Sequence, residues 1–436
     1  MEYSPNDWSL RHVHDRSERF IAGVTCRQVG KTVTAAMEID EGMSAPPDHD
    51  GPPRVGLVAP TYAHCDIAVD RYRSYLVETF GRESHRYNTN KHTLTIEDPK
   101  AGTPGAQLIW RSAEDPTFVM GYTFSKLIFD ESQRVPDEVY SKALPTADAR
   151  DAQVIAFGTP DINPDQSWFK ALWLLGQESD QPDHYSFTVS CYENPHTTIE
   201  KILQAKAGIT EREFRMLYLG EWVDDEGQFF TNFEDSLLPY TPEYNPKTRH
   251  VMGVDFAIVE DYTAVIVGET STKTAIYRRR WNRTDPIETY DRIADIWERY
   301  GKPVAFCDAT ATGGMSMMRE LQERGIRCVP IKFGTNNKLE IYTRLAGDLE
   351  HRRLMFPKEW DDVIRELKAF MYQKTPSGNV TAAAAAGFHD DLVAALALLN
   401  EGMHQRGGRP SKRQYSYAAP AKDGYDKLRE LIGVRY

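Results

Sequence analysis

The sequence predicts an α/β protein of two domains that are built on different patterns. At 436 residues the chain exceeds the size at which one hydrophobic core stays compact, so two domains are expected. The first half alternates apolar strands with helices, which favours a parallel sheet covered on both faces. The second half opens with three consecutive strands and then alternates helices with strands, with acidic residues at strand ends.

The first half contains five expected strands and two clear helices. The strands are expected at residues 19–25, 54–59, 107–111, 126–130 and 153–157. The helices are expected at about 30–41 and 65–80. Residues 168–222 are expected to be mostly helical, as a lid or linker subdomain. Residues 227–247 are rich in Pro, Tyr and Asn, which marks them as the domain boundary.

The second half has five expected strands and four helices. The strands are expected at residues 251–254, 263–270, 273–281, 303–307 and 327–332. The helices are expected at 286–300, 316–324, 337–350 and about 389–403. Three meandering strands followed by this alternation are the pattern of a ribonuclease H-like domain. The alanine-rich run at 382–386 has no role assigned to it.

Composition excludes several classes of protein. Hydrophobic content of 41% and charged content of 27% are typical of a soluble globular chain. No apolar run reaches the roughly 18 residues that a membrane span needs, and residues 1–11 lack a signal-peptide core. The five cysteines show no paired spacing, which favours free thiols in a reducing cytosol over a zinc site or disulfides.

The charge balance argues against a protein coated all over by DNA, because the formal net charge is −12. Local contact remains open. The basic and aromatic stretch at 277–281 and the tail at 406–413, with Arg409 and Lys412, fit the tracking of phosphates. They fit a solvated strand edge and a disordered tail equally well.

A phosphate-binding loop is predicted at residues 25–32, Thr-Cys-Arg-Gln-Val-Gly-Lys-Thr. A loop between strand and helix aims backbone N–H groups at phosphate. Gly30 allows close approach, Lys31 neutralises the β- and γ-phosphates, and Thr32 ligates Mg²⁺. Thr25 stands where the usual motif has Gly, but the strand before and the helix after support the assignment. ATP with Mg²⁺ is the expected cofactor of a P-loop ATPase domain.

Two further strand ends complete this predicted site. Residues 126–131 form an apolar strand that ends in Asp130 and Glu131, at the edge where ligands bind in such sheets. Asp130 is expected to hold Mg²⁺ through water, and Glu131 to orient and deprotonate the attacking water. In Gly158-Thr159-Pro160 the hydroxyl of Thr159 could sense the γ-phosphate, although spacing alone favours a simple strand-ending turn.

A second, acidic site is predicted in the second half. Asp255 and Asp308 end strands, and Asp390 and Asp391 open the last helix, where acids suit the helix dipole. Each Asp alone fits a turn or a helix cap. Together, at converging places, they predict a site for two Mg²⁺ or Mn²⁺ ions that hydrolyses a phosphodiester. Asp261 could assist.

In combination these motifs resemble the large terminase subunit of tailed double-stranded DNA viruses, from about residue 20 to residue 403. The phosphate loop matches the family's variant form, which often lacks the leading Gly, and Gly158-Thr159-Pro160 is similar to its coupling motif. The other segments that carry the resemblance are 127–131, Phe214, Tyr218, Gly220, Glu221, Trp222, 253–255, 306–308 and 389–391.

The resemblance implies further roles in the loop. Arg27 is implied as an arginine finger within the subunit, which is chemically reasonable for a guanidinium beside a transferring phosphoryl group. Gln28 belongs to the same nucleotide-binding loop. Where the family often has Arg-Gly, this chain has Met120-Gly121, which leaves Arg111 and Arg134 as substitutes for a finger that reaches a neighbouring subunit. The candidates for contact with adenine are His12, Arg16 and Trp8.

The resemblance also implies function and partners. It implies an ATPase and endonuclease that drives double-stranded DNA into a procapsid and cuts concatemers. The implied partners are the portal protein, a small terminase subunit and further copies in a ring of five, with no membrane. The place of action is the host cytoplasm, transiently at the portal vertex, and not the mature virion. Alternatives are a translocase or helicase with a non-cutting second domain, and a ribonuclease H-like transposase or resolvase with an ATPase half.

The expected domains follow from these assignments. The ATPase domain spans 1–225, with the lid or linker subdomain at about 168–225. A linker follows at 226–245, and the nuclease domain spans 246–405. Residues 406–436 form a basic tail that is expected to be flexible.

Overall fold

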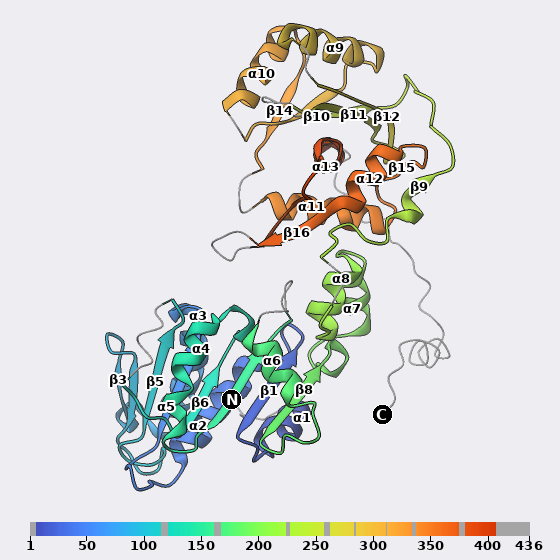
Figure 1. Cartoon of the computed structure of the whole chain (residues 1–436). Helices are drawn as coiled ribbons and strands as arrows, with labels where there is room; N and C mark the ends of the chain where they lie inside the picture. The colour runs from blue at the N-terminus through green and yellow to red at the C-terminus, as the bar shows by residue number, and fades with distance from the viewer. Residues whose placement is uncertain are drawn as a thin grey trace. The chain divides into compact units, whose positions relative to one another are not determined.

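The structure is a computed structural model that describes residues 6–114, 121–160, 167–223, 227–256, 262–282, 285–310, 312–333, 337–374 and 380–406. The chain divides into two compact units, Met1–Gly227 and Gln228–Tyr436 (Figure 1). Within the described residues, no helix combines the length and the apolar character that crossing a bilayer requires.

The first unit is built on an eight-stranded sheet in the order β3-β4-β5-β2-β6-β7-β1-β8. The pairs from β5 to β8 are all parallel, which confirms the predicted parallel sheet, and β3 and β4 extend it as an antiparallel edge. The strands are β1 Phe20–Thr25, β2 Arg54–Ala59, β3 His85–Asn88, β4 Thr93–Ile96, β5 Gln107–Ser112, β6 Lys126–Phe129, β7 Gln153–Gly158 and β8 His184–Val189.

Helices cover both faces of this sheet. Along β6, Ile128 packs into one core, while Leu127 and Phe129 pack into the other, because successive side chains of a strand point to opposite faces. The first core contains α2 (Lys31–Ser44) and α3 (Tyr62–Phe80). The second contains α4 (Asp137–Ala143), α5 (Pro145–Asp148) and α6 (Trp168–Leu175). The remaining helices of this unit are α1 (Asp7–Ser9), α7 (Ile199–Lys206) and α8 (Glu211–Phe214).

The segment 168–222 differs from the mostly helical expectation. It contains β8, which pairs with β1 over its whole length and forms the last strand of the sheet. Ser186, Phe187 and Val189 are buried, so this part of the segment belongs to the sheet and its cores and not to a separate helical lid. The end of β8 lies beside the phosphate loop, since the N–H of Cys26 donates to the carbonyl of Val189 at 2.8 Å.

The second unit has a five-stranded mixed sheet in the order β12-β11-β10-β13-β14. The first three are antiparallel and the last three parallel, which confirms the ribonuclease H-like pattern. The strands are β10 His250–Asp255, β11 Thr263–Glu269, β12 Thr274–Trp281, β13 Val304–Asp308 and β14 Cys328–Ile331.

Two layers of helices cover this sheet. On β10, Val251 packs into one core, and Met252 and Val254 pack into the other. The core with Val251 contains α11 (Lys338–Glu350), α12 (Asp361–Ala369) and α13 (Asp391–Arg406). The core with Met252 contains α9 (Pro286–Arg299) and α10 (Thr312–Glu323). Of these helices, α12 has no counterpart among the sequence expectations.

Residues 228–238 pack on the second unit, although they lie within the stretch expected to be a linker. Phe229, Phe230 and Phe233 are buried in its core. The strand β9 (Leu237–Leu238) pairs with β15 (Phe356–Pro357). Apolar side chains buried in this way stabilise the unit to which they belong.

The alanine-rich run is a strand. β17 (Val380–Ala384) pairs antiparallel with β16 (Phe370–Lys374), where Ala382 lies opposite Tyr372, and Ala382 is buried in the same core as Phe370. Small side chains suit a strand that lies close against a helical layer.

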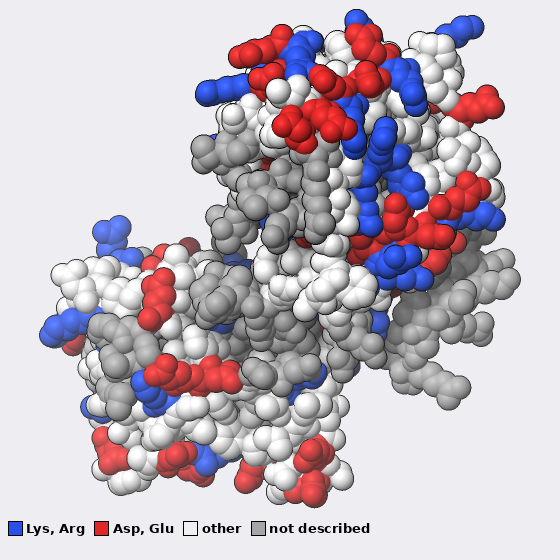
Figure 2. All heavy atoms as spheres, turned by 45° about the horizontal axis from the view of Figure 1, so that its top comes forward, with Lys and Arg blue, Asp and Glu red and all other residues white. Residues whose placement is uncertain are grey.

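Charges are mixed on the visible surface. Figure 2 shows Lys and Arg interspersed with Asp and Glu on the face that it presents. In the basic stretch 277–281, Arg278 pairs with Asp362 at 2.6 Å and Arg280 pairs with Glu366 at 2.5 Å. Only Arg279 of the three arginines is exposed. The described part of this stretch is therefore largely neutralised within the chain, and Arg409 and Lys412 lie outside the described residues.

Candidate functional site

The phosphate loop has the backbone conformation that its sequence suggests. Gln28 and Gly30 have positive φ angles of 60° and 104°. A Cβ at Gly30 would meet the amide nitrogen of Asn6 at 2.7 Å, so both the conformation and the space favour glycine. Helix α2 begins at the next residue, Lys31. The N–H groups of Val33 and Thr34 donate to the carbonyl of Gly30, so the N–H groups at the very start of the helix, those of Lys31 and Thr32, are the ones that can face an anion.

The carbonyl groups of the loop are held by side chains from elsewhere in the unit. The carbonyl of Val29 accepts from Asn6 Nδ2 and from Trp8 Nε1, both at 3.1 Å, and that of Gln28 accepts from Asn194 Nδ2 at 3.1 Å. Turning these carbonyls away leaves the N–H side of the loop for phosphate. Trp8 is 2% exposed, so this candidate for adenine contact instead braces the loop.

Lys31 joins three separate motifs. Its Nζ lies 3.0 Å from Thr159 Oγ1, to which it donates, and 3.3 Å from Glu131 Oε1. Thr159 Oγ1 donates in turn to the carbonyl of Thr25 at 3.2 Å. Thr159 is therefore within the site, and Gly158-Thr159-Pro160 is more than the strand-ending turn that spacing alone favours.

Glu131 is held in place by Gln133. Gln133 Nε2 donates to Glu131 Oε2 at 2.8 Å, and Gln133 Oε1 accepts from the N–H of Thr159 at 3.1 Å. Burial raises the pKa of Glu131, but the charge of Lys31 and hydrogen bonds from Gln133 and Lys31 outweigh this and bring it below its ordinary value. Glu131 is thus ionised at neutral pH, as a general base requires.

Asp130 has a different environment. It is 5% exposed, and its Oδ1 accepts from the N–H of Glu131 at 2.9 Å. Burial raises the pKa of Asp130 to about 6, against the opposing effect of Lys31. A buried carboxylate of this kind is a suitable ligand for a hard divalent cation, whose charge would favour the ionised form.

Lys31, Glu131 and Thr159 lie on the wall of a cavity of about 700 Å³. Arg27, Gln28, Gly30, Lys31 and Thr32 of the loop line it, together with Glu131 and Thr159. Arg134 also lines it and is exposed, whereas Arg111 is 7% exposed and donates to the carbonyl of Trp110 and to the Tyr122 hydroxyl. Arg111 therefore cannot serve a neighbouring subunit, and Arg134 remains a candidate.

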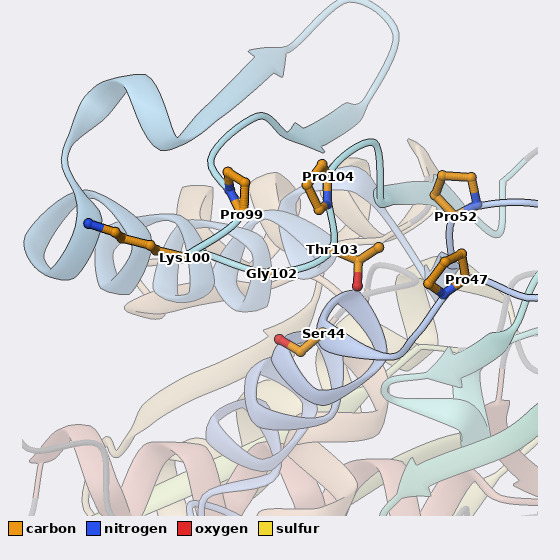
Figure 3. A pocket seen from close by; sticks show the side chains of 8 residues that line it. All are labelled: Ser44, Pro47, Pro52, Pro99, Lys100, Gly102, Thr103 and Pro104. Carbon is orange, nitrogen blue, oxygen red and sulfur yellow. The ribbon is translucent and has the colours of Figure 1, made fainter.

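A second cavity, of about 580 Å³, has a different character. Figure 3 shows Ser44, at the C-terminal end of α2, facing the loop that carries Pro99 and Thr103. Four of its eight lining residues are prolines, and Lys100 is the charged one among the eight. It lies at the end of α2 away from the phosphate loop.

The acidic site of the second unit is built by strand register. In the parallel pairing of β10 with β13, Val254 lies opposite Cys307, so the next residues, Asp255 and Asp308, are neighbours at one edge of the sheet. Asp308 Oδ1 accepts from the N–H of Thr310 at 2.8 Å and from its hydroxyl at 2.5 Å. These bonds orient Asp308 and leave its other oxygen for a ligand.

The Asp390–Asp391 pair reaches the same place. Tyr342 of α11 is buried, and burial raises its pKa well above the ordinary value. Four nearby carboxylates add to this effect: those of Asp390, Asp255, Asp308 and Asp391. All four predicted ligands therefore lie near enough to Tyr342 for their charges to act on its hydroxyl. Asp261, the fifth acid considered, lies outside the described residues.

Among the described residues, the groups of three potential ligands whose atoms all lie within 4.8 Å of one another occur elsewhere, at His14, Glu38 and Glu41 and at Asp48, His49 and Asp50, and these aspartates form no such group.

Two site residues were not expected from the sequence. Gln133 follows Asp130-Glu131 closely, and no pattern distinguishes it from a loop residue. Glu366 lies beside Asp391, in α12. The signal for that helix is present, because Trp360, Val363 and Leu367 repeat at helical spacing.

Comparison with known proteins covers both units. Residues 23–236 match the family model described as terminase large subunit, T4likevirus-type, N-terminal, and residues 252–401 match the terminase RNaseH-like domain. The chain belongs to the large terminase subunit family. The resemblance stated from the motifs is thereby confirmed, as is the expectation of a packaging ATPase and nuclease at the level of the family.

Relatives from bacteriophages cover nearly the whole chain. The large terminase subunits of Thermus virus P23-45 and Thermus phage G20c are each 26% identical, over 431 and 435 residues, and cover 91% of this chain and 87% of their own. A crystal structure of the large terminase from another thermophilic bacteriophage, at 15% identity, covers 91% of this chain and 99% of its own with a TM-score of 0.55. The last similarity shows a shared fold.

Proposed function

We propose that the first unit hydrolyses ATP at the cavity around Lys31. The observation that supports this most directly is that Lys31, Glu131 and Thr159, from three motifs far apart in the chain, meet within 3.3 Å. Lys31 and Arg27 would bind the phosphates, with the N–H groups around Gln28 and Gly30. Glu131 would take a proton from the attacking water, and Thr159 would report the state of the γ-phosphate to β7.

The residues present fit Mg²⁺ in this site. Thr32 offers a hydroxyl at the start of α2, and Asp130 offers a carboxylate whose pKa of about 6 reflects its burial. Mg²⁺ would supply charge neutralisation on the phosphates.

We propose that the second unit cleaves DNA at the aspartates around Tyr342. Asp255, Asp308, Asp390 and Asp391 would hold two Mg²⁺ or Mn²⁺ ions, which fit because the donors are all carboxylate oxygens. Such ions supply an activated water and stabilise the leaving oxygen. The chain's own part is to fix the four carboxylates at one edge of the sheet.

The proposed substrate and partners follow from the family. Double-stranded DNA is the cargo and the nuclease substrate, and a portal protein, a small terminase subunit and a ring of five copies are the proposed assembly. The place of action would be the host cytoplasm at the portal of a procapsid. Arg134, exposed at the cavity, is an arginine placed to act on a neighbouring copy, and Arg71 shares both properties.

The test compares two substitutions in the full chain. Lys31→Ala should reduce ATP turnover by at least ~100-fold and leave Mn²⁺-dependent cutting of supercoiled plasmid intact. Asp308→Asn should do the reverse. If Asp308→Asn removed both activities from a folded chain, the assignment of the two sites to separate units would be wrong. If neither Lys31→Ala nor the wild-type chain cut plasmid at any Mn²⁺ concentration, the second unit would not be a nuclease.

A further inference from the structure

The N-terminus of α13 has an unusual cap. Helix α13 begins at Asp391, so Asp390 occupies the N-cap position, where an Asp side chain ordinarily accepts from the N–H groups that follow. Here Glu366 accepts them instead. Its Oε2 lies 2.9 Å from the N–H of Leu392 and 3.3 Å from that of Val393. The cap is therefore supplied by another helix, α12.

Glu366 is itself held in place. It is 4% exposed, and its other oxygen, Oε1, accepts from Arg280 Nη1 of β12 at 2.5 Å. The Arg280 guanidinium also lies over the ring of Tyr262, 4.7 Å from its centroid. One carboxylate thus uses both oxygens, one for the helix and one for the strand.

This arrangement has a consequence for the acidic site, where Asp390 and Asp391 are proposed metal ligands. A carboxylate that caps its own helix points back at the N–H groups of the first turn. With those N–H groups bound to Glu366, the Asp390 carboxylate is released from that geometry. The same bonds fix the first turn of α13, from which both aspartates project.

We propose that Glu366 is a positioning residue of the nuclease. It caps α13 from α12 and is itself held by its ion pair with Arg280. In this way it keeps Asp390 and Asp391 in the orientation that binds metal. The inference rests on the proposed metal site of the second unit. Glu366 does not contact substrate and is not itself assigned as a ligand.

The chain contains a matched control. Asp362 lies one turn before Glu366 on α12 and pairs at 2.6 Å with Arg278, which lies two residues before Arg280 on β12. Both ion pairs tie α12 to β12, but the bonds to α13 come from Glu366. Asp362→Asn therefore removes the same kind of contact without touching the cap.

The substitution Glu366→Gln is the sharpest variant. An amide has one acceptor oxygen, whereas the carboxylate serves two sets of donors, so Gln must abandon either Arg280 or α13. We expect Mn²⁺ binding to the full, nucleotide-free chain, followed by the electron paramagnetic resonance of free Mn²⁺, to weaken about 10- to 100-fold. In the metal-free chain, amide hydrogen exchange in a peptide covering residues 391–394 should be faster in Glu366→Gln than in the wild type. Asp362→Asn should leave the Mn²⁺ affinity and the exchange rate close to those of the wild type.

Cutting assays add a further readout. For Glu366→Gln, the Mn²⁺ concentration at half-maximal plasmid cutting should rise by the same factor, while saturating Mn²⁺ recovers much of the rate. Unchanged Mn²⁺ affinity and exchange in Glu366→Gln, or equal losses in Asp362→Asn, would overturn the proposal. If Glu366→Gln failed to fold, wild-type exchange would still decide, because unprotected amides at Leu392 and Val393 contradict the cap.

A third variant distinguishes a failure of the positioning role of Glu366 from a failure of the proposed metal site. Asp308→Asn should lose Mn²⁺ binding while the amides of Leu392 and Val393 stay protected. If Asp308→Asn bound Mn²⁺ normally, the metal site would be wrong whatever Glu366 did. If it lost binding and Glu366→Gln did not, the site would stand and the positioning role would fail.

Discussion

Single side chains link the parts of the first site. Gln133 bridges Glu131 and the backbone of Thr159 through two hydrogen bonds, at 2.8 and 3.1 Å. It therefore connects the residue that would activate water with the loop that would sense the γ-phosphate. Lys31 makes the same connection through charge.

Replacing Gln133 with Ala should lower kcat for ATP hydrolysis on the order of tenfold or more, since Glu131 loses the donor that orients it. The KM for ATP should change little, because Gln133 does not belong to the phosphate loop. Steady-state phosphate release measures both constants. An increase in KM at constant kcat would show instead that Gln133 acts in nucleotide binding.

Asp40 of α2 allows a prediction on pH. Burial raises the pKa of Asp40 from an ordinary value near 4 to about 6. Between these values the folded chain keeps a proton that the unfolded chain releases, so the free energy of unfolding falls as pH rises through this window. Asp40→Asn should therefore stabilise the first unit at pH 7.5, by about 1–2 kcal/mol after allowance for solvent screening.

The gain should shrink as the pH falls from 6 toward 4, because Asp40 is then protonated in the folded chain and increasingly so in the unfolded chain. Urea unfolding of wild type and Asp40→Asn at pH 4.5, 6 and 7.5 measures the difference directly. A gain that was constant with pH would point to a cause other than ionisation.

Among single residues, the sequence predicted most of the positions of the candidate site residues. Lys31, Asp130, Glu131, Asp255 and Asp308 lie where strand ends and one loop motif place them. Contacts that depend on folding could not be predicted, because no local pattern shows that Trp8 reaches the carbonyl of Val29 or that Arg111 is buried against its own unit.

Among the elements, α13 and β10 determine whether the acidic site forms. They pack so closely at Gly253 that an added Cβ would lie 2.1 Å from the carbonyl oxygen of Ala395 and 2.6 Å from the nitrogen of Leu399. Backbone atoms cannot turn aside as a side chain can. The glycine of Gly253-Val254-Asp255 thus permits the contact that brings Asp255 toward Asp390 and Asp391.

Gly253→Ala should push α13 away from β10. We expect the second unit to lose about 1–3 kcal/mol of stability, the usual cost of overpacking, and plasmid cutting to fall sharply. ATP turnover should remain as an internal control, because the change lies in the other unit. Thermal unfolding and both activity assays test this, and full cutting by Gly253→Ala would contradict the close packing.

Elements with strong periodicity could be predicted, and those defined by pairing could not. The strands β1, β2, β10 and β11 were expected within a residue or two, because their apolar runs are long. β8 was missed because its burial depends on pairing with β1, and the β16–β17 hairpin because alanines carry little strand signal. α12 was missed despite its regular apolar spacing.

At the scale of the whole molecule, the two chemistries occupy two units that each have their own cores on both faces of a sheet. A chain organised in this way can lose one activity and keep the other. The division also fixes what a fragment must contain. Residues 228–238 provide buried side chains and the strand β9 to the second unit.

A fragment of residues 228–406 should therefore fold and cut plasmid with Mn²⁺, whereas one of residues 246–406 should not. The shorter fragment lacks Phe229, Phe230 and Phe233, each of which is worth about 1.5–3 kcal/mol when fully buried, and it leaves β15 without its partner β9. That loss is comparable with the whole stability of an ordinary domain. Circular dichroism, thermal unfolding and cutting of the two purified fragments decide the matter. Equal stability would show that residues 228–245 are a linker after all, and that the core of the second unit closes without them.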